Sequence, residues 1–303
     1  MAVENGLADV EGEKNWAGTT YGSGWMHRWL IWVLRWMDVR LLYAFSAVFI
    51  VPVCLLLNSS RGIIYRYFRR RQGYGRLLSA WKTYTNHCLF SQVVIDRFAM
   101  YAGRRFSIEV EGYEHFQRLA SRSEGFVLLS SHIGNYEIAG YTLVAEDKPF
   151  NAVVYQGEKE SVMEGRSRMF AGTHIRMIPM SADMSHLFAI DYALQQGETV
   201  SIPADRVFGS QKTLTVRFLG AEARLPQGPF RVAAMRGIDV LAINVMKVRA
   251  RAYKIYVCPL SYEKEQARSG QMQQLASAYV AELERMLKLH PAQWYNFFEF
   301  WTA

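Results

Sequence analysis

The stretch that decides the fold is GFVLLSSHIGNYE, residues 125–137. It begins with an almost wholly apolar run, as in a strand that is covered on both faces of a sheet. His132 follows this run, Gly134 allows the chain to turn sharply, and Glu137 comes five residues after the histidine. Ligands of open α/β sheets bind at the carboxyl ends of the strands, so we expect reactive side chains at this point.

Outward from this strand, apolar runs alternate with amphipathic segments. Strands are expected over 105–112, 125–131, 150–156, 175–181, 198–205, 239–248 and 252–261, with a hairpin over 214–225. Helices are expected over 81–101, 114–122, 135–146, 160–173, 184–197, 228–237 and 270–291. In the first of these helices, Phe90, Val94 and Phe98 share a face, and we expect Asp96 and Arg97 to point away from it. The alternation predicts an α/β domain whose mostly parallel, mixed sheet is flanked by helices.

The first apolar segment before this domain is rich in tryptophan. Its pattern, WMHRWLIWVLRWMD over 25–38, places four rings on one helix face: Trp25, Trp29, Trp32 and Trp36. Arg28 and Arg35 flank the rings. This is typical of a helix that lies in a membrane interface, with the rings at the acyl boundary. A helix in the core of a soluble domain is the alternative.

The next segment, residues 41–60, contains 20 uncharged residues between Arg40 and Arg61. A helix of this length just reaches across a hydrocarbon core of about 30 Å. Pro52 interrupts it and its last three residues are polar, so a span and a re-entrant segment both remain open. We therefore expect an N-terminal hydrophobic helical membrane anchor. The predicted organisation is a mobile N-terminus over 1–24, a membrane-associated helical region over 25–80, and the α/β domain over 81–303.

Composition agrees with a membrane partner. The net charge is +8 and 14% of the residues are aromatic, which favours an anionic membrane surface. The basic and aromatic segment 65–81 resembles a patch that binds anionic lipid, and no signature of a nucleic-acid-binding module is present. No cleavable signal peptide is evident. The three cysteines are widely spaced, which argues against a disulfide framework and a cysteine-based zinc site.

The opening stretch predicts acid–base chemistry. With Asn135 as the N-cap of the next helix, the turn can bring Glu137 to one nitrogen of the His132 imidazole, leaving the other nitrogen as a base. The order Ser130–Ser131–His132 invites a serine nucleophile, but the G-x-S-x-G pattern is absent. A purely structural histidine is the alternative.

The stretch SSHIGNYE carries H-x4-E, which resembles the H-x4-D/E motif of the membrane-associated glycerolipid acyltransferase superfamily. SHIGNYE looks like the branch of late acyltransferases of lipid A biosynthesis. Further blocks follow in the order expected for that branch, namely GRSRM, IPADRVFG, FLGAEARLPQGPFRVAAMRG and HPAQWYNFFEFW. The resemblance covers roughly residues 25–301.

This resemblance implies that residues 81–303 are an acyltransferase domain. It implies transfer of a fatty acyl chain from acyl carrier protein, or from the less favoured coenzyme A, to a hydroxyl of a lipid A precursor. The reaction would take place at the cytoplasmic face of a bacterial inner membrane, without a metal or other cofactor and without nucleic acid. His132 would be the general base and Glu137 its orienting partner.

The resemblance implies supporting roles for further residues. Arg168, with Arg166 as the alternative, matches the family's arginine for the oxyanion or substrate. Asp205 matches a functional acid, and Arg206 is suited to a lipid phosphate, although a local ion pair between these two is equally open. Asn135 binds substrate or only caps a helix.

Other functions remain open at this stage. The same chemistry suits another lipid acceptor, such as an amino-acid lipid, a lysophospholipid or a polyene. A non-catalytic lipid-binding scaffold with the same fold is the alternative from a different class. The aromatic tail, 294–301, either packs against the domain or touches lipid.

Overall fold

The computed structural model describes residues 23–138, 142–143, 148–155, 160–170, 174–180, 185–207 and 212–301. The predicted mobile N-terminus, 1–24, lies outside the described residues except for its last two positions.

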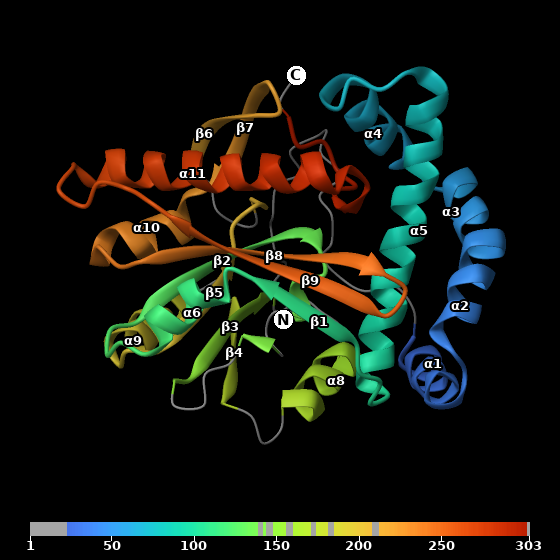
Figure 1. The fold of residues 1–303 in the computed structure, drawn as a ribbon, viewed down its shortest axis with the longest axis horizontal. Coiled ribbons are helices and arrows are strands. Elements are labelled where there is room, and N and C mark those ends of the chain that lie inside the picture. Colours follow the sequence, from blue (N-terminus) through green and yellow to red (C-terminus); the bar gives the residue numbers. More distant parts are fainter. Residues whose placement is uncertain are drawn as a thin grey trace, which may run out of the picture.

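A seven-stranded sheet forms the centre of the molecule (Figure 1). In spatial order its strands are β1 (Ser107–Glu111), β9 (Ala252–Leu260), β8 (Val240–Arg249), β2 (Phe126–Gly134), β5 (Thr199–Pro203), β3 (Phe150–Tyr155) and β4 (Ile175–Met180). Neighbouring strands are parallel except β8 and β9, which are antiparallel. A separate antiparallel hairpin consists of β6 (Thr213–Phe218) and β7 (Ala221–Pro226). The predicted α/β class with a mostly parallel, mixed sheet is confirmed.

Helices cover both faces and one end of this sheet. They are α1 (Gly24–Trp36), α2 (Val39–Phe45), α3 (Val51–Leu57), α4 (Arg61–Arg66), α5 (Arg76–Tyr101), α6 (Tyr113–Ala120), α8 (Glu160–Phe170), α9 (Ser185–Gln195), α10 (Gln227–Arg236) and α11 (Arg268–Leu289). The described residues also form two π-helical segments, η1 (Ser46–Ile50) and η2 (Tyr67–Arg71), and two 3-10 turns, η3 (Tyr136–Ile138) and η4 (Pro291–Gln293). Figure 1 shows α10 and α11 on one side of the sheet and α5 standing across its end, with α1–α3 beyond α5.

Strand β2 lies in the middle of the sheet and is buried on both faces. Val127 and Leu129 point into the core beneath α9, α10 and α11. Phe126 and Leu128 point into a second core, beneath α6. Because both faces need apolar side chains, the strand appears in the sequence as a continuous hydrophobic run.

The helix predicted over 135–146 does not begin at Asn135, and most of its remaining length lies outside the described residues. Strand β2 continues to Gly134, and the 3-10 turn η3 follows it; residues 139–141 and 144–147 lie outside the described part. Gly134 has φ +68°, and a Cβ there would overlap the carbonyl oxygen of Val245 on β8. The Asn135 amide donates to that same oxygen at 2.7 Å, which keeps the chain on the sheet beyond His132.

Helix α5 also departs from the prediction. It begins at Arg76 and passes through residue 81 without a break, so the expected boundary between 80 and 81 falls inside a helix. Asp96 and Arg97 do not point to solvent, since their side chains are 0% and 14% exposed. The reason is that α5 contacts α1–α4 as well as the sheet region, so it has no wholly solvated face along this part.

The tryptophan face of α1 is exposed as the interfacial interpretation expects. Its four rings are 58–79% exposed, whereas His27, Val33 and Leu34 on the other face are buried. The alternative of a core helix is therefore wrong for this face. The continuous segment Val39–Leu57 is long and apolar enough to cross a membrane by length and composition. Its arrangement in a membrane stays a prediction.

Candidate active site

His132 lies near the carboxyl end of β2 and contacts the carboxylate of Asp205. The imidazole Nδ1 is 2.8 Å from Asp205 Oδ1, and the His132 backbone amide donates to Asp205 Oδ2 at 2.8 Å. One carboxylate thus holds both the ring and the backbone of the histidine. The His132 side chain is 18% exposed and that of Asp205 is 2% exposed.

The register of two neighbouring parallel strands brings these residues together. Ser130 of β2 pairs with Pro203 of β5, and the Ala204 amide donates to the Ser130 carbonyl oxygen at 3.0 Å. Asp205 is the next residue after this last ladder bond. On the other edge of β2, the pairing with β8 shifts register between Ser130 and Gly134, which brackets His132. The site therefore lies where β5 ends and β2 becomes irregular.

The electrostatics of this pair favour a neutral imidazole beside an ionised carboxylate. Burial lowers the pKa of His132 below its usual value, and the negative charge of Asp205 only partly offsets this. Burial opposes ionisation of Asp205, but His132 and the nearby Arg206 hold its pKa below the usual value. An ionised Asp205 accepts from Nδ1–H, so the lone pair of the imidazole lies on Nε2.

Glu137 is held by two arginines. Its Oε1 accepts from Arg166 Nη2, and its Oε2 lies 3.1 Å from Arg97 Nε. Tyr101 Oη donates to the same carboxylate at 3.5 Å. Burial opposes ionisation of Glu137, yet the charges of Arg166 and Arg97 hold its pKa below the usual value. Two cations and one anion give this cluster a net charge of +1.

The predicted pairing of His132 with Glu137 is therefore corrected. The carboxylate at Nδ1 is that of Asp205, while Glu137 turns toward the two guanidinium groups. The reason is that the turn η3 directs the Glu137 side chain toward α5 and α8. Asp205 follows β5, which pairs with β2 and places this carboxylate beside His132.

The other predicted site residues take different positions. Arg166 on α8 is 8% exposed and engaged with Glu137. Arg168 lies on the same helix, and its side chain is outside the described part. Asn135 does not begin a regular α-helix; its Nδ2 donates to Tyr253 Oη at 3.4 Å. Arg206 Nη2 donates to the Tyr295 carbonyl oxygen at 2.9 Å, and the charge of Arg206 helps to lower the pKa of Asp205.

The C-terminal segment takes part in the site, which the sequence left open. Trp294 forms a β-bridge with Ile133, and the Tyr295 amide donates to the His132 carbonyl oxygen at 3.3 Å. Trp294 is 2% exposed and belongs to the main core. The tail therefore packs against the domain at this point and fixes β2 beyond His132.

Sequence reasoning missed Arg97 and the cluster that surrounds its neighbour Asp96. The Asp96 carboxylate accepts from Lys247 Nζ and from the hydroxyls of Tyr43 and Tyr253. The signal that was available is the pair of adjacent charges within the apolar stretch VVIDRFAM, residues 93–100. Charged residues are rarely buried unless they are paired, so charges in such a stretch predict buried partners.

This arrangement combines a proton acceptor, the imidazole of His132, with a nearby cluster of positive charge. The Nε2 of a neutral, oriented imidazole can accept a proton from a hydroxyl group. The cluster of Arg97, Glu137 and Arg166 carries excess positive charge, and the charge of Arg97 contributes to the low pKa of His132. Such a charge can stabilise an anion that forms near the base.

The comparisons with known proteins all lead to acyltransferases. The model of the family "Bacterial lipid A biosynthesis acyltransferase" matches residues 98–302. A phosphatidylinositol mannoside acyltransferase of Mycobacterium tuberculosis is 23% identical over 201 residues, or 66% of this chain and 62% of the relative. One of Mycolicibacterium smegmatis is 21% identical over 65% of this chain and 63% of the relative. The chain thus spans less than two thirds of the length of these relatives.

Among solved structures, the 1-acyl-sn-glycerophosphate acyltransferase PlsC of Thermotoga maritima matches with a TM-score of 0.40 and 14% identity. The match covers 89% of this chain and all of that one.

Proposed function

Because the chain belongs to the bacterial lipid A biosynthesis acyltransferase family, we propose that it transfers a fatty acyl chain from a thioester to a hydroxyl group of a membrane lipid. The observation that carries this proposal is the contact of 2.8 Å between His132 Nδ1 and Asp205 Oδ1 at the ends of adjacent parallel strands. A scaffold without catalytic activity would not need a buried carboxylate that sets the tautomer of a partly exposed histidine.

In the proposed reaction His132 is the general base. Its Nε2 takes the proton of the acceptor hydroxyl while the oxygen attacks the thioester carbonyl carbon. The tetrahedral intermediate then collapses, the carbon–sulfur bond breaks, and the thiolate takes the proton from the imidazolium. Asp205 orients the ring and stabilises the imidazolium. The products are an ester and a free thiol, so atoms and charges balance without a cofactor.

The oxyanion of this intermediate needs a positive partner. We assign this role to the cluster of Arg97, Glu137 and Arg166, because its two guanidinium groups give it a net positive charge. Glu137 then has a positioning role, because its carboxylate keeps the two guanidinium groups in place. Arg168, two residues after Arg166 on α8, remains a second candidate for the oxyanion or for substrate. Asn135 and Arg206 stay candidates for substrate contact.

For the finer identity of the substrates, we propose acyl carrier protein as the donor and a lipid A precursor as the acceptor. The family description supports the acceptor class. We also propose the cytoplasmic face of a bacterial inner membrane as the location, supported by the exposed tryptophan face of α1 and the apolar segment after it.

A second acceptor is favoured by the relatives, which are named phosphatidylinositol mannoside acyltransferases. In either case the proposed acceptor group is a hydroxyl of a membrane lipid, so the same general base serves both. The two proposals differ in the acceptor and not in the chemistry.

The test is a lipid mass profile of a strain that lacks this protein, complemented by the wild type, by His132→Ala or by Asp205→Asn. Loss of one acyl chain from lipid A, restored by the wild type alone, supports the full proposal. Loss of a chain from another glycolipid keeps the chemistry and refutes the lipid A acceptor. An unchanged lipid profile, or equal rescue by His132→Ala, refutes the catalytic assignment.

A further inference from the structure

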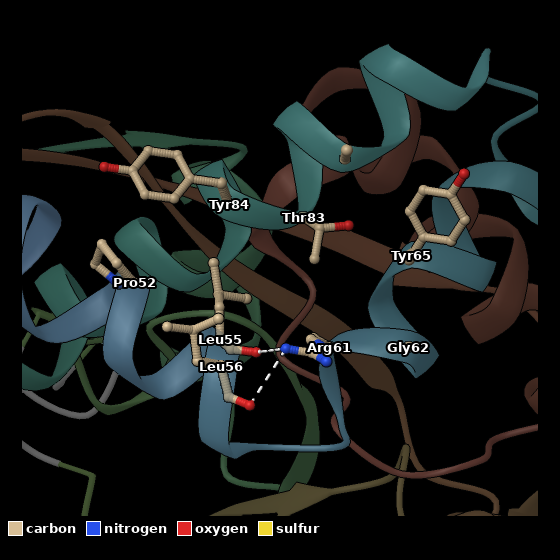
Figure 2. A pocket seen from close by; sticks show the side chains of 9 residues that line it. Pro52, Leu55, Leu56, Arg61, Gly62, Tyr65, Thr83 and Tyr84 are labelled. Atoms are coloured by element: carbon tan, nitrogen blue, oxygen red, sulfur yellow. Dashed lines mark hydrogen bonds between the residues drawn. The ribbon is translucent and has the colours of Figure 1, made fainter.

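A groove of about 550 Å³ lies between α3, α4 and α5 (Figure 2). Pro52, Leu55 and Leu56 of α3 form one wall, and Tyr65 of α4 and Tyr84 of α5 line it from other sides. Its volume falls within the range of about 300–1,000 Å³ that is usual for small-molecule sites.

Three of the polar side chains at this groove, those of Arg61, Tyr84 and Thr83, are engaged within the protein. Arg61 Nη1 donates to the carbonyl oxygens of Leu55 and Leu56, which end α3. Tyr84 Oη donates to the Ala47 carbonyl oxygen at 3.0 Å, and Thr83 Oγ1 donates to that of Ser79 at 2.7 Å. The groove therefore offers mainly hydrocarbon to an occupant, which fits an apolar chain.

The surface around the groove is also apolar. Leu57 at the end of α3 is 83% exposed and Leu77 at the start of α5 is 88% exposed. Leu56, Leu78 and Trp81 on the same helices are exposed as well. An exposed apolar surface of this extent is typical of a protein or membrane contact.

The stretch of chain that forms the groove is basic, and this charge indicates the partner. The sequence has no acidic residue between Asp38 and Asp96, while this interval contains eight basic residues. They are Arg40, Arg61, Arg66, Arg69, Arg70, Arg71, Arg76 and Lys82. Basic side chains beside an apolar surface are complementary to a leaflet of anionic phospholipid.

The segments that precede the groove in the chain, α2 and η1, are fastened to α5. Tyr43 donates to Asp96 of α5, whose carboxylate is 0% exposed. Ser46 and Ser91 form a hydrogen bond a little further along the same two helices. These bonds hold α2 and η1 against α5, so the apolar surface is presented together with the domain and not as a detached anchor.

We propose that this groove binds one acyl chain of an anionic phospholipid of the membrane, with the surrounding arginines contacting the lipid phosphate. The site is distinct from the proposed acyl-transfer site. Thr83 and Arg97 are 14 residues apart on α5, which corresponds to about 21 Å along the helix axis. The groove is thus a docking site for a bound phospholipid. This proposal does not depend on which lipid accepts the acyl chain in the proposed reaction.

The experiment uses the full chain and a phosphatidylglycerol probe with a photoactivatable group in one acyl chain, in vesicles of phosphatidylcholine and phosphatidylglycerol. We expect the label on peptides that contain Leu55, Tyr65 or Tyr84. Ala80→Trp places an indole in the groove and should reduce this labelling at least fivefold. Ala281→Trp makes the same change at an exposed position of α11 and should leave the labelling unchanged.

Gly62→Leu fills the groove from α4 and serves as the second variant if Ala80→Trp unfolds, because a Cβ at Gly62 meets only the guanidinium of Arg66, at 3.3 Å. Labelling that is confined to α1, or that both groove variants leave unchanged while folded, overturns the proposal.

The charge is tested separately. Arg70→Gln combined with Arg76→Gln should weaken binding to the anionic vesicles by about 25-fold at low salt, at about fivefold for each arginine. Equal labelling by a phosphatidylcholine probe, or vesicle binding that the double variant leaves unchanged, overturns the anionic lipid. Acyl transfer to a detergent-dispersed acceptor should survive in all these variants, so failure of this proposal is distinguishable from failure of the proposed function.

Discussion

Asp205→Asn is the most informative change. It replaces one carboxylate oxygen by an NH2 group, and it tests whether Asp205 or Glu137 orients the imidazole of His132. The carboxylate of Asp205 accepts two hydrogen bonds of 2.8 Å from His132, one from the backbone amide and one from Nδ1. An asparagine has only one acceptor oxygen. The backbone amide can only donate, so it takes that oxygen, and the asparagine NH2 group then faces Nδ1.

An NH2 group at Nδ1 requires a lone pair on that nitrogen and places the proton on Nε2. The ring is then in the wrong tautomer to accept a proton from the acceptor hydroxyl. In a Ser-His-Asp triad the corresponding change lowers kcat by about 10⁴-fold. We expect a loss of about 10³–10⁴-fold here, or about 4–5.4 kcal/mol of transition-state stabilisation.

The assay is single-turnover acyl transfer at saturating donor, with binding of the acceptor measured separately. Asp191→Asn, at an exposed aspartate that pairs with Arg236, is the matched control and should keep full activity. The reasoning is refuted if Asp205→Asn retains activity within threefold of the wild type. It is also refuted if Glu137→Gln, and not Asp205→Asn, gives an inactive protein of normal stability, since Glu137 would then be the orienting partner of His132.

Four further outcomes are expected. Glu137→Gln should destabilise the fold by about 3–5 kcal/mol in urea unfolding, because it leaves buried cations without their carboxylate; a change below 1 kcal/mol contradicts the cluster. The acid limb of kcat/KM should have its midpoint below the usual imidazole pKa of 6.5, since burial lowers the pKa of His132 and the neutral ring is the active form. The lowered pKa of His132 also makes the free energy of unfolding depend on pH. This contribution to stability is fully present above pH 6.5 and is lost as the pH falls through the lower pKa of the folded state. Unfolding measured at a series of pH values checks this. Gly134→Ala should lower both stability, by more than about 2 kcal/mol, and activity, because φ is +68° and the new Cβ would overlap Val245; a melting temperature equal to that of the wild type would contradict this.

The sequence alone determined the elements whose signal is local. The strand over 125–131, the helix over 81–101 and the tryptophan face of α1 each follow from a hydrophobic period that a single segment contains. The position of His132 near the carboxyl end of a buried strand was predictable for the same reason, although β2 continues two residues beyond it, to Gly134.

Only the tertiary structure decided which carboxylate His132 contacts. Glu137 is five residues away in the sequence and Asp205 is 73 residues away. The distant residue takes the place at Nδ1 because β5 pairs with β2 in a register that brings Asp205 beside the histidine. A pairing register between strands that are far apart in the chain leaves no periodic trace in either segment. The burial of Arg97 has the same origin, since it depends on the helices that pack around α5 and not on the pattern of α5 itself.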